Sequence, residues 1–227
     1  MRVWITRAQP GAEATAAEVR RLGHEPFVAP LLEVRAVGPA TLDLTGVGAL
    51  AFTSANGVRA FAERSAERDL PAFAVGAATA RAARVAGFPH VTASDGGVAA
   101  LAGTILAARG GFAGEVLQPG AAELAGDLAG QLAAGGVAAR ALALYETRPR
   151  APTAAELAQL PDLDLALVHS AKGAAALAAV LAAHPAPRLS VAALSAAAIR
   201  PLADTPLAAR RAAARPSEAA LLALIAP

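Results

Sequence analysis

Hydroxyl, amide and guanidinium side chains recur in this sequence where short apolar, strand-like runs end. Free backbone N–H groups at a strand-to-helix turn, with the positive end of the helix dipole behind them, bind anions. A group of such turns at one edge of a sheet would suit a substrate with several acidic groups. The candidate substrate-binding residues are Thr6, Arg7, Thr53, Ser54, Asn56, Gly76, Thr79, Ser170 and Lys172.

These residues also have structural interpretations, and the sequence leaves both open. The only tyrosine ends another strand-like run. The alternatives are helix capping for Ser54 and Thr79, a tight turn for Gly76, a solvated position for Arg7 and Lys172, and a buried structural hydroxyl for Tyr145.

Metal, thiol and nucleotide chemistry are not expected. The chain has no cysteine, which excludes disulfides and thiolate nucleophiles. Only His169 among the four histidines follows a strand on the expected ligand side, and no two histidines have metal-binding spacing. We find no catalytic triad, no G-x-G-x-x-G and no Walker sequence, so we expect no cofactor.

The charge pattern is not typical of a nucleic-acid-binding protein. The net charge is +2 and Lys172 is the only lysine, so arginine carries nearly all the positive charge, and it is dispersed along the chain. We find neither a signal-peptide pattern nor an uncharged apolar run of about 18 residues. We therefore expect the chain to bind a small molecule rather than nucleic acid or a membrane. The absence of cysteine fits a reducing compartment, and no long amphipathic seam indicates an obligate oligomer, so we expect a cytoplasmic monomer.

Strand-like and helical segments alternate, which favours parallel sheets covered by helices. A helix should begin at Ser54, and Thr153 with Glu156 forms a capping-box pattern. Strands are expected at 3–6, 27–29, 49–52, 72–75, 116–117, 140–145, 165–168 and 191–194, and helices at 12–22, 54–64, 79–86, 122–134, 172–183 and 216–225.

The two halves of the chain resemble each other. A-F-T-S-A-N-G-V-R-A-F (51–61) is similar to L-V-H-S-A-K-G-A-A-A-L (167–177), and A-V-G-A-A-T-A (74–80) is similar to A-L-S-A-A-A-I (193–199). A duplicated unit of this kind predicts two similar parallel-sheet α/β domains. Because ligands bind beyond the carboxyl ends of strands in such sheets, we expect the site in a cleft between the domains.

Four segments in register together resemble the uroporphyrinogen-III synthase family. They are I-T-R-A-Q-P-G near the start, F-T-S-A-N-G-V-R-A-F, F-A-V-G-A-A-T-A-R-A-A-R-V-A-G-F, and L-A-L-Y-E-T-R-P. The resemblance implies one domain of residues 1–35 plus 151–227 and another of residues 37–147. It also implies a two-stranded antiparallel connector near 33–37 and 146–150.

The resemblance implies a cofactor-free lyase, which cyclises the linear polycarboxylate hydroxymethylbilane to uroporphyrinogen III with inversion of ring D and loss of water. Tyr145 would be the catalytic hydroxyl donor, and the polar turns would position the substrate. The sequence departs from the family pattern at Ser195, Ala198 and His169, and Q-P-G-A-A-E-L (118–124) lacks the usual basic residues.

Two alternatives remain. The departures at Ser195 and Ala198 favour a non-enzymatic ligand-binding or regulatory module on the same fold. An unrelated two-domain protein that senses a small anion is the other alternative.

Overall fold

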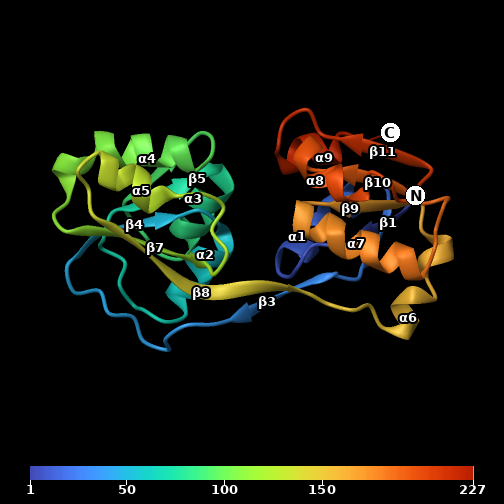
Figure 1. The fold of residues 1–227 in the computed structure, drawn as a ribbon, viewed down its shortest axis with the longest axis horizontal. Helices are drawn as coiled ribbons and strands as arrows, with labels where there is room; N and C mark the ends of the chain where they lie inside the picture. The colour runs from blue at the N-terminus through green and yellow to red at the C-terminus, as the bar shows by residue number, and fades with distance from the viewer. Residues whose placement is uncertain (227) are drawn as a thin grey trace. The chain divides into compact units, whose positions relative to one another are not determined.

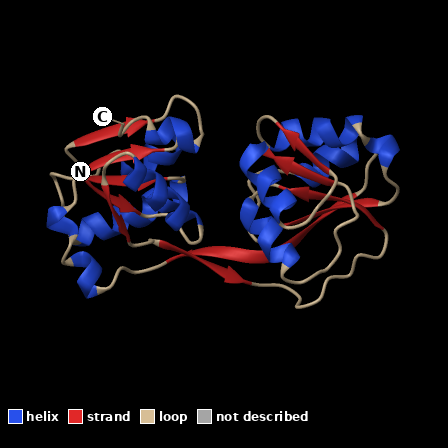
Figure 2. Ribbon diagram, turned by 180° about the vertical axis from the view of Figure 1, so that it is seen from behind, coloured by secondary structure: helices blue, strands red, loops and turns tan. Residues whose placement is uncertain are grey.

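Continuous apolar runs form the central strands of two sheets in the computed structural model, which describes residues 1–226 (Figures 1 and 2). The first sheet is entirely parallel and has the order β11 (Ala209–Ala212), β10 (Ser190–Ala193), β9 (Leu165–Val168), β1 (Arg2–Ile5) and β2 (Glu25–Val28). The second has the order β3 (Leu32–Ala36), β8 (Ala139–Pro149), β7 (Glu115–Ala121), β4 (Val47–Phe52), β5 (Ala72–Val75) and β6 (Val91–Ser94), and is parallel from β8 to β6.

Most of the helices follow a strand and return the chain to the next one. The α-helices are α1 (Gly11–Arg21), α2 (Ala55–Ala62), α3 (Gly76–Val85), α4 (Val98–Ala107), α5 (Leu128–Ala134), α6 (Ala154–Leu157), α7 (Ala171–Ala183), α8 (Ala196–Ile199) and α9 (Glu218–Leu222). Short 3-10 helices lie at Arg109–Gly111, Leu160–Asp162 and Arg200–Leu202.

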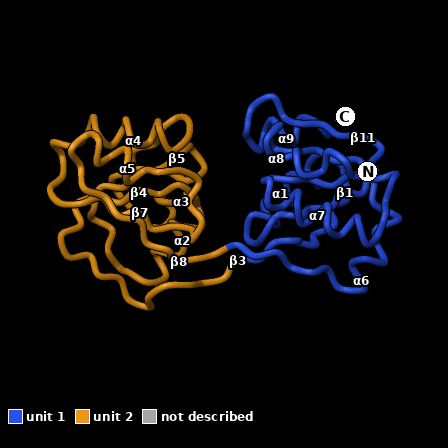
Figure 3. Tube along the Cα trace, viewed as in Figure 1, with its two compact units in different colours: residues 1–34, 147–227 blue, residues 35–146 orange. Residues whose placement is uncertain are grey.

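The chain forms two compact units, coloured separately in Figure 3. Unit 1 comprises Met1–Val34 and Thr147–Pro227, and unit 2 comprises Arg35–Glu146. The chain therefore passes between the units twice, once within β3 and once within β8.

Alternate residues of the unit 1 strands build two cores, one on each face of the sheet, as the two-residue period of a strand requires. On one face Trp4 and Val191 pack with Leu177 of α7, and the indole N–H of Trp4 donates to the carbonyl of Ala29 at 2.7 Å. On the other face, Ile5 packs with helices α1 and α9. Both faces are covered, which explains why β9 is buried at every position.

Unit 2 is built in the same way. Ala49 and Ala51 of β4 face α4 and α5, where Leu101 and Leu132 are fully buried. On the opposite face Phe52 meets Phe61 of α2 and Phe88 edge-on, with ring centroids 5.9 and 5.6 Å away. These rings form a compact aromatic core directly below the turn that follows β4.

The expected α/β fold with parallel sheets is confirmed, but some element assignments were wrong. The helix expected over 122–134 begins only at Leu128, because β7 continues to Ala121 and the Asp127 carboxylate caps the helix by accepting from the Gly130 N–H. Strands β6 and β11 were not expected, whereas β3 overlaps the segment near 33–37 that was expected as one strand of the connector. Strand β6 is half exposed and β11 is mostly exposed, and they are held by pairing with β5 and β10, respectively.

Within residues 1–226, none of the helices combines the length and apolar character needed to cross a bilayer.

A substitution at Gly48 tests how closely β4 approaches the loop that contains Ala113. A Cβ at this position would overlap the carbonyl oxygen of Ala113, whereas a Cβ at Gly103 in α4 would meet nothing within 4 Å. We expect Gly48→Ala to lower the free energy of unfolding by about 1–3 kcal/mol, and Gly103→Ala to leave it equal or raise it by about 0.5–1 kcal/mol. Urea denaturation measures both, and equal effects would contradict the packing described.

Candidate active site

The turn after β4 joins Ser54 to Tyr145. Ser54 is the N-cap of α2, and its Oγ accepts a hydrogen bond from the Gly57 N–H at 3.0 Å. The same Oγ lies 2.8 Å from the phenol oxygen of Tyr145. Because Oγ accepts from the backbone, Ser54 is free to donate its own proton to Tyr145, which would leave the phenol proton for another acceptor.

Gly57 lets α2 approach β7 closely enough for this contact. A Cβ on Gly57 would lie 2.7 Å from the carbonyl oxygen of Pro119, so any larger residue would push the first turn of the helix away. Asn56, in the same turn, accepts a hydrogen bond from Arg59 through its side-chain oxygen. Its amide N–H groups therefore point away from Arg59.

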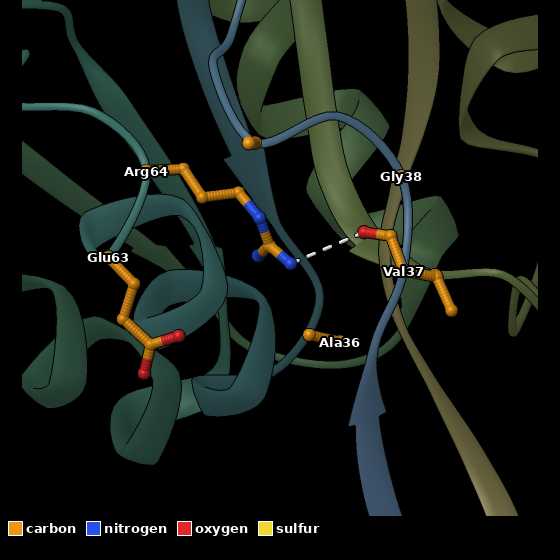
Figure 4. Close-up of a pocket in the computed structure, with 6 residues that line it drawn as sticks. Ala36, Val37, Gly38, Glu63 and Arg64 are labelled. Atoms are coloured by element: carbon orange, nitrogen blue, oxygen red, sulfur yellow. Dashed lines mark hydrogen bonds between the residues drawn. The ribbon is translucent and has the colours of Figure 1, made fainter.

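Arg64 braces the backbone immediately before Tyr145. Its guanidinium donates to the carbonyls of Leu144 at 3.0 Å and Val37 at 3.3 Å, and the Val37 N–H donates to Leu144 at 3.0 Å. Figure 4 shows Arg64 pointing toward Val37 in a hollow beside β3. Gly38 belongs to this hollow and has φ +75°, and a Cβ there would overlap the Ala143 carbonyl. The brace fixes the strand that carries the tyrosine.

The turn after β5 has no capping side chain. Helix α3 begins at Gly76, whose φ of +71° lies in the region open mainly to glycine, and its N-cap is Val75. The alternative role of Thr79 as a helix cap is therefore wrong: Thr79 lies inside α3 and is buried. The N-terminal N–H groups of α3 receive no hydrogen bond from a cap side chain, as is also the case for α1 and α4.

Unit 1 carries a second set of polar turns. Ser170 repeats the geometry of Ser54: its backbone φ and ψ are −158° and 160°, against −157° and 154°, and its Oγ accepts from the Gly173 N–H at 3.1 Å. Lys172 donates to the carbonyl of Thr147 at 3.0 Å. Thr6 is fully buried and donates to the carbonyl of Leu167 at 2.7 Å, so its side chain holds the sheet together.

Arg7 belongs to a polar cluster centred on Glu218. Arg7 Nη1 donates to Glu218 Oε2 at 3.1 Å, and His169 Nε2 lies 3.1 Å from the same oxygen. The hydroxyl of Thr15 donates to the other carboxylate oxygen at 2.5 Å. Burial acts to raise the pKa of Glu218, but the hydrogen bond and charge of His169, the Thr15 hydroxyl and the Arg7 charge outweigh it and lower that pKa to about 2.

Sequence reasoning missed Glu218, Thr15 and Gln118. Glu218 was recognised only as part of a helix start. Gln118 is 2% exposed, and neither atom of its amide has a hydrogen-bond partner within residues 1–226. A lone polar residue amid apolar neighbours, as at Thr15 and Gln118, was the available signal. Within the same residues no group of three or more His, Asp or Glu side chains could hold a metal ion.

The architecture and the polar strand ends place the chain among α/β proteins with parallel sheets. Residues 13–223 match the family model of uroporphyrinogen-III synthase HemD, so the chain belongs to the uroporphyrinogen-III synthase family, cyclising hydro-lyases of heme biosynthesis. This confirms the resemblance inferred from the four motifs.

Solved structures agree in fold. The chain is similar to uroporphyrinogen-III synthetase from Helicobacter pylori, with a TM-score of 0.69, 19% identity, and coverage of 99% of this chain and 97% of that one. It is also similar to a mutant uroporphyrinogen III synthase from the extremely thermophilic bacterium Thermus thermophilus, with a TM-score of 0.54, 18% identity, and coverage of 99% and 97%. A search of curated protein sequences gives no match.

The depressed pKa of Glu218 predicts an acid-dependent loss of stability. Because the folded-state pKa is about 2 and the ordinary value is 4.5, the ionised carboxylate stabilises the fold fully above about pH 4.5 and progressively less as the pH falls toward 2. The shift corresponds to about 3 kcal/mol. Solvent screening of a side chain that is 35% exposed reduces this to about 1–2 kcal/mol.

Urea denaturation from pH 7 to pH 2.5 tests this. Glu218→Gln should be less stable than wild type at neutral pH, and the difference should shrink below pH 4.5. A difference that stays constant over this range would contradict the assignment.

Proposed function

We propose that this chain is a uroporphyrinogen-III synthase, which cyclises hydroxymethylbilane with inversion of ring D and loss of water. The observation that supports this most directly, beside the family membership, is the hydroxyl pair of Ser54 and Tyr145 at the N-terminus of α2. The alternative of a non-enzymatic module receives no support from the similar proteins, all of which are named as synthases or synthetases.

Loss of the terminal hydroxyl of the substrate needs a proton donor, because hydroxide is a poor leaving group. In the proposed step Tyr145 donates its phenol proton to the departing oxygen, either directly or through a water molecule, and Ser54 donates to the phenol oxygen. The positive end of α2 stabilises the negative charge that develops on that oxygen. The cation left on the substrate is stabilised by its own electron-rich pyrroles.

Control of the product depends on geometry more than on acid strength. Unassisted closure of hydroxymethylbilane gives the I isomer, so the enzyme must hold the chain end where ring D is attacked at its substituted carbon. We propose that the strand-end turns bind the acidic side arms. The residues assigned to this positioning are Thr6, Arg7, Thr53, Ser54, Asn56, Gly76, Thr79, Ser170 and Lys172. Of these, Thr6 would act only through the backbone of its turn, because its hydroxyl is already engaged.

The proposal includes the domain organisation. We propose that the two units act as two domains, joined by a two-stranded connector formed around β3 and β8, and that the substrate is held in a cleft between them. The similar turns of Ser54 and Ser170, one in each unit, support a shared substrate. We also propose that the enzyme acts as a cytoplasmic monomer, without a cofactor.

The decisive experiment adds hydroxymethylbilane to the purified protein and separates the products after oxidation to porphyrins. A product that is mainly the III isomer supports the proposal. Formation of only the I isomer at the spontaneous rate would show that the chain is a binder and not a synthase.

Tyr145→Phe removes the proton donor and keeps the ring. We expect kcat for formation of the III isomer to fall by about 100-fold or more, while the free energy of unfolding changes by only about 1 kcal/mol. The rate of III-isomer formation and the III-to-I ratio measure the effect. Unchanged turnover would remove Tyr145 from the mechanism.

Ser54→Ala and Ser195→Ala form a matched pair. Both remove a serine N-cap that follows a strand, since Ser195 Oγ accepts from the Ala198 N–H at 3.1 Å, and each should cost about 1 kcal/mol of stability. Only Ser54 also contacts Tyr145. We therefore expect kcat to fall about 10-fold for Ser54→Ala and to stay within about 2-fold for Ser195→Ala. Equal activities of the two variants would contradict the role of the Ser54 hydroxyl.

A further inference from the structure

The cluster around Glu218 joins four parts of unit 1 that are far apart in the sequence. Arg7 lies after β1, Thr15 in α1, His169 after β9 and Glu218 at the start of α9. Glu218 Oε2 accepts from Arg7 and from His169, each at 3.1 Å, and Oε1 accepts from Thr15 at 2.5 Å. With this many contacts from separate elements, the Glu218 carboxylate is held in one orientation.

The use of His169 indicates that stability alone does not explain the cluster. Its side chain is only 10% exposed, and its Nδ1 is buried without a hydrogen-bond partner among residues 1–226. An unpartnered buried nitrogen costs roughly 1–3 kcal/mol. The His169 imidazole therefore makes a hydrogen bond to Glu218 through Nε2 while its Nδ1 makes none to the described residues.

The guanidinium of Arg7 makes its hydrogen bonds to the described residues through one nitrogen, Nη1. The acceptors are Glu218 and Thr15. The guanidinium also packs against Gly11, where a Cβ would lie 2.7 Å from Nε and 2.8 Å from Nη2. This leaves the Nε–H and Nη2–H edge, the edge that binds a carboxylate with two parallel hydrogen bonds, without an internal acceptor among residues 1–226.

We propose that Glu218 is a positioning residue, which acts through Arg7 to present the Nε–H and Nη2–H edge to a carboxylate of the substrate. Thr15 and His169 keep Glu218 in place, and the absence of a side chain at Gly11 gives the guanidinium its room. The inference rests on the proposed function in one respect, the polycarboxylate nature of the substrate.

Removal of the Glu218 carboxylate distinguishes two roles, because a counterion and a positioning residue have opposite effects on anion binding. Glu218 is a negative charge 3.1 Å from Arg7. If it acted only as a counterion, its removal would strengthen the binding of an anion. If it orients Arg7, its removal weakens binding, because the guanidinium must be ordered again for each binding event.

The experiment compares KM and kcat for hydroxymethylbilane in full-length variants. We expect Glu218→Gln to raise KM about 5- to 10-fold with kcat within about 2-fold, because only ground-state and transition-state binding of a remote carboxylate is lost. Gly11→Ala should raise KM in the same way by displacing the guanidinium. Glu218→Asp, which restores the charge, should recover part of the loss.

A double-mutant cycle separates positioning from an independent contribution. If Glu218 acts through Arg7, Arg7→Ala and Arg7→Ala/Glu218→Gln should have the same KM within about 2-fold. Ser217→Ala is the matched control, since it removes the N-cap of α9, where Ser217 Oγ accepts from Ala220, without touching Arg7. It should lower the melting temperature and leave KM unchanged.

Tighter binding by Glu218→Gln, additive effects in the cycle, or a raised KM in Ser217→Ala would each overturn the proposal. Should the wild-type protein form no III isomer, the proposed function fails while this inference is still tested by titrating the same variants with uroporphyrin III, an octacarboxylate. Wild-type binding weakened about 5-fold or more by Glu218→Gln would support it, and equal binding by the two or none by the wild type would overturn it.

Discussion

Parallel strand pairing is the constraint on which the polar turns of this chain depend. In a parallel sheet every strand ends at the same edge, so the residues that follow β4, β5 and β7 lie together, as do those that follow β1, β9 and β10. The covering helices start at these ends and direct their N–H groups there. The backbone therefore adds positive potential at each edge, in a chain whose net charge is only +2.

The same serine serves structure and proposed chemistry at the β4 turn. Ser54 Oγ uses one lone pair for the Gly57 N–H, which fixes the oxygen, and the Tyr145 hydroxyl is then held at 2.8 Å from it. Ser170 makes the matching cap in unit 1, and the only tyrosine of the chain belongs to unit 2. The two units thus share one cap geometry, and in unit 2 the capping serine also contacts a tyrosine.

Local patterns in the sequence were enough for the elements that local interactions control. The capping box of Thr153 and Glu156 and the cap at Ser54 were predictable, because each depends on residues within three positions. The edge strand Ala209–Ala212 was not, because its residues are mostly exposed and only its pairing with β10 makes it a strand. The contact of Glu218 with Arg7 spans 211 positions, and no periodic pattern encodes it. The family was recognisable since four segments occur in register, whereas the assignment of Tyr145 and the turn residues stays a prediction.

The close approach of Gly57 to the carbonyl of Pro119 has a consequence for how this protein can diverge. At exposed positions such as Gly103, where a Cβ would meet nothing within 4 Å, small residues can be exchanged without moving the backbone. Position 57 has no such freedom, because a single methyl group there would shift the helix, its serine cap and the oxygen beside the tyrosine as one body. A larger residue at position 57 could therefore be accommodated only together with a new backbone path around Pro119.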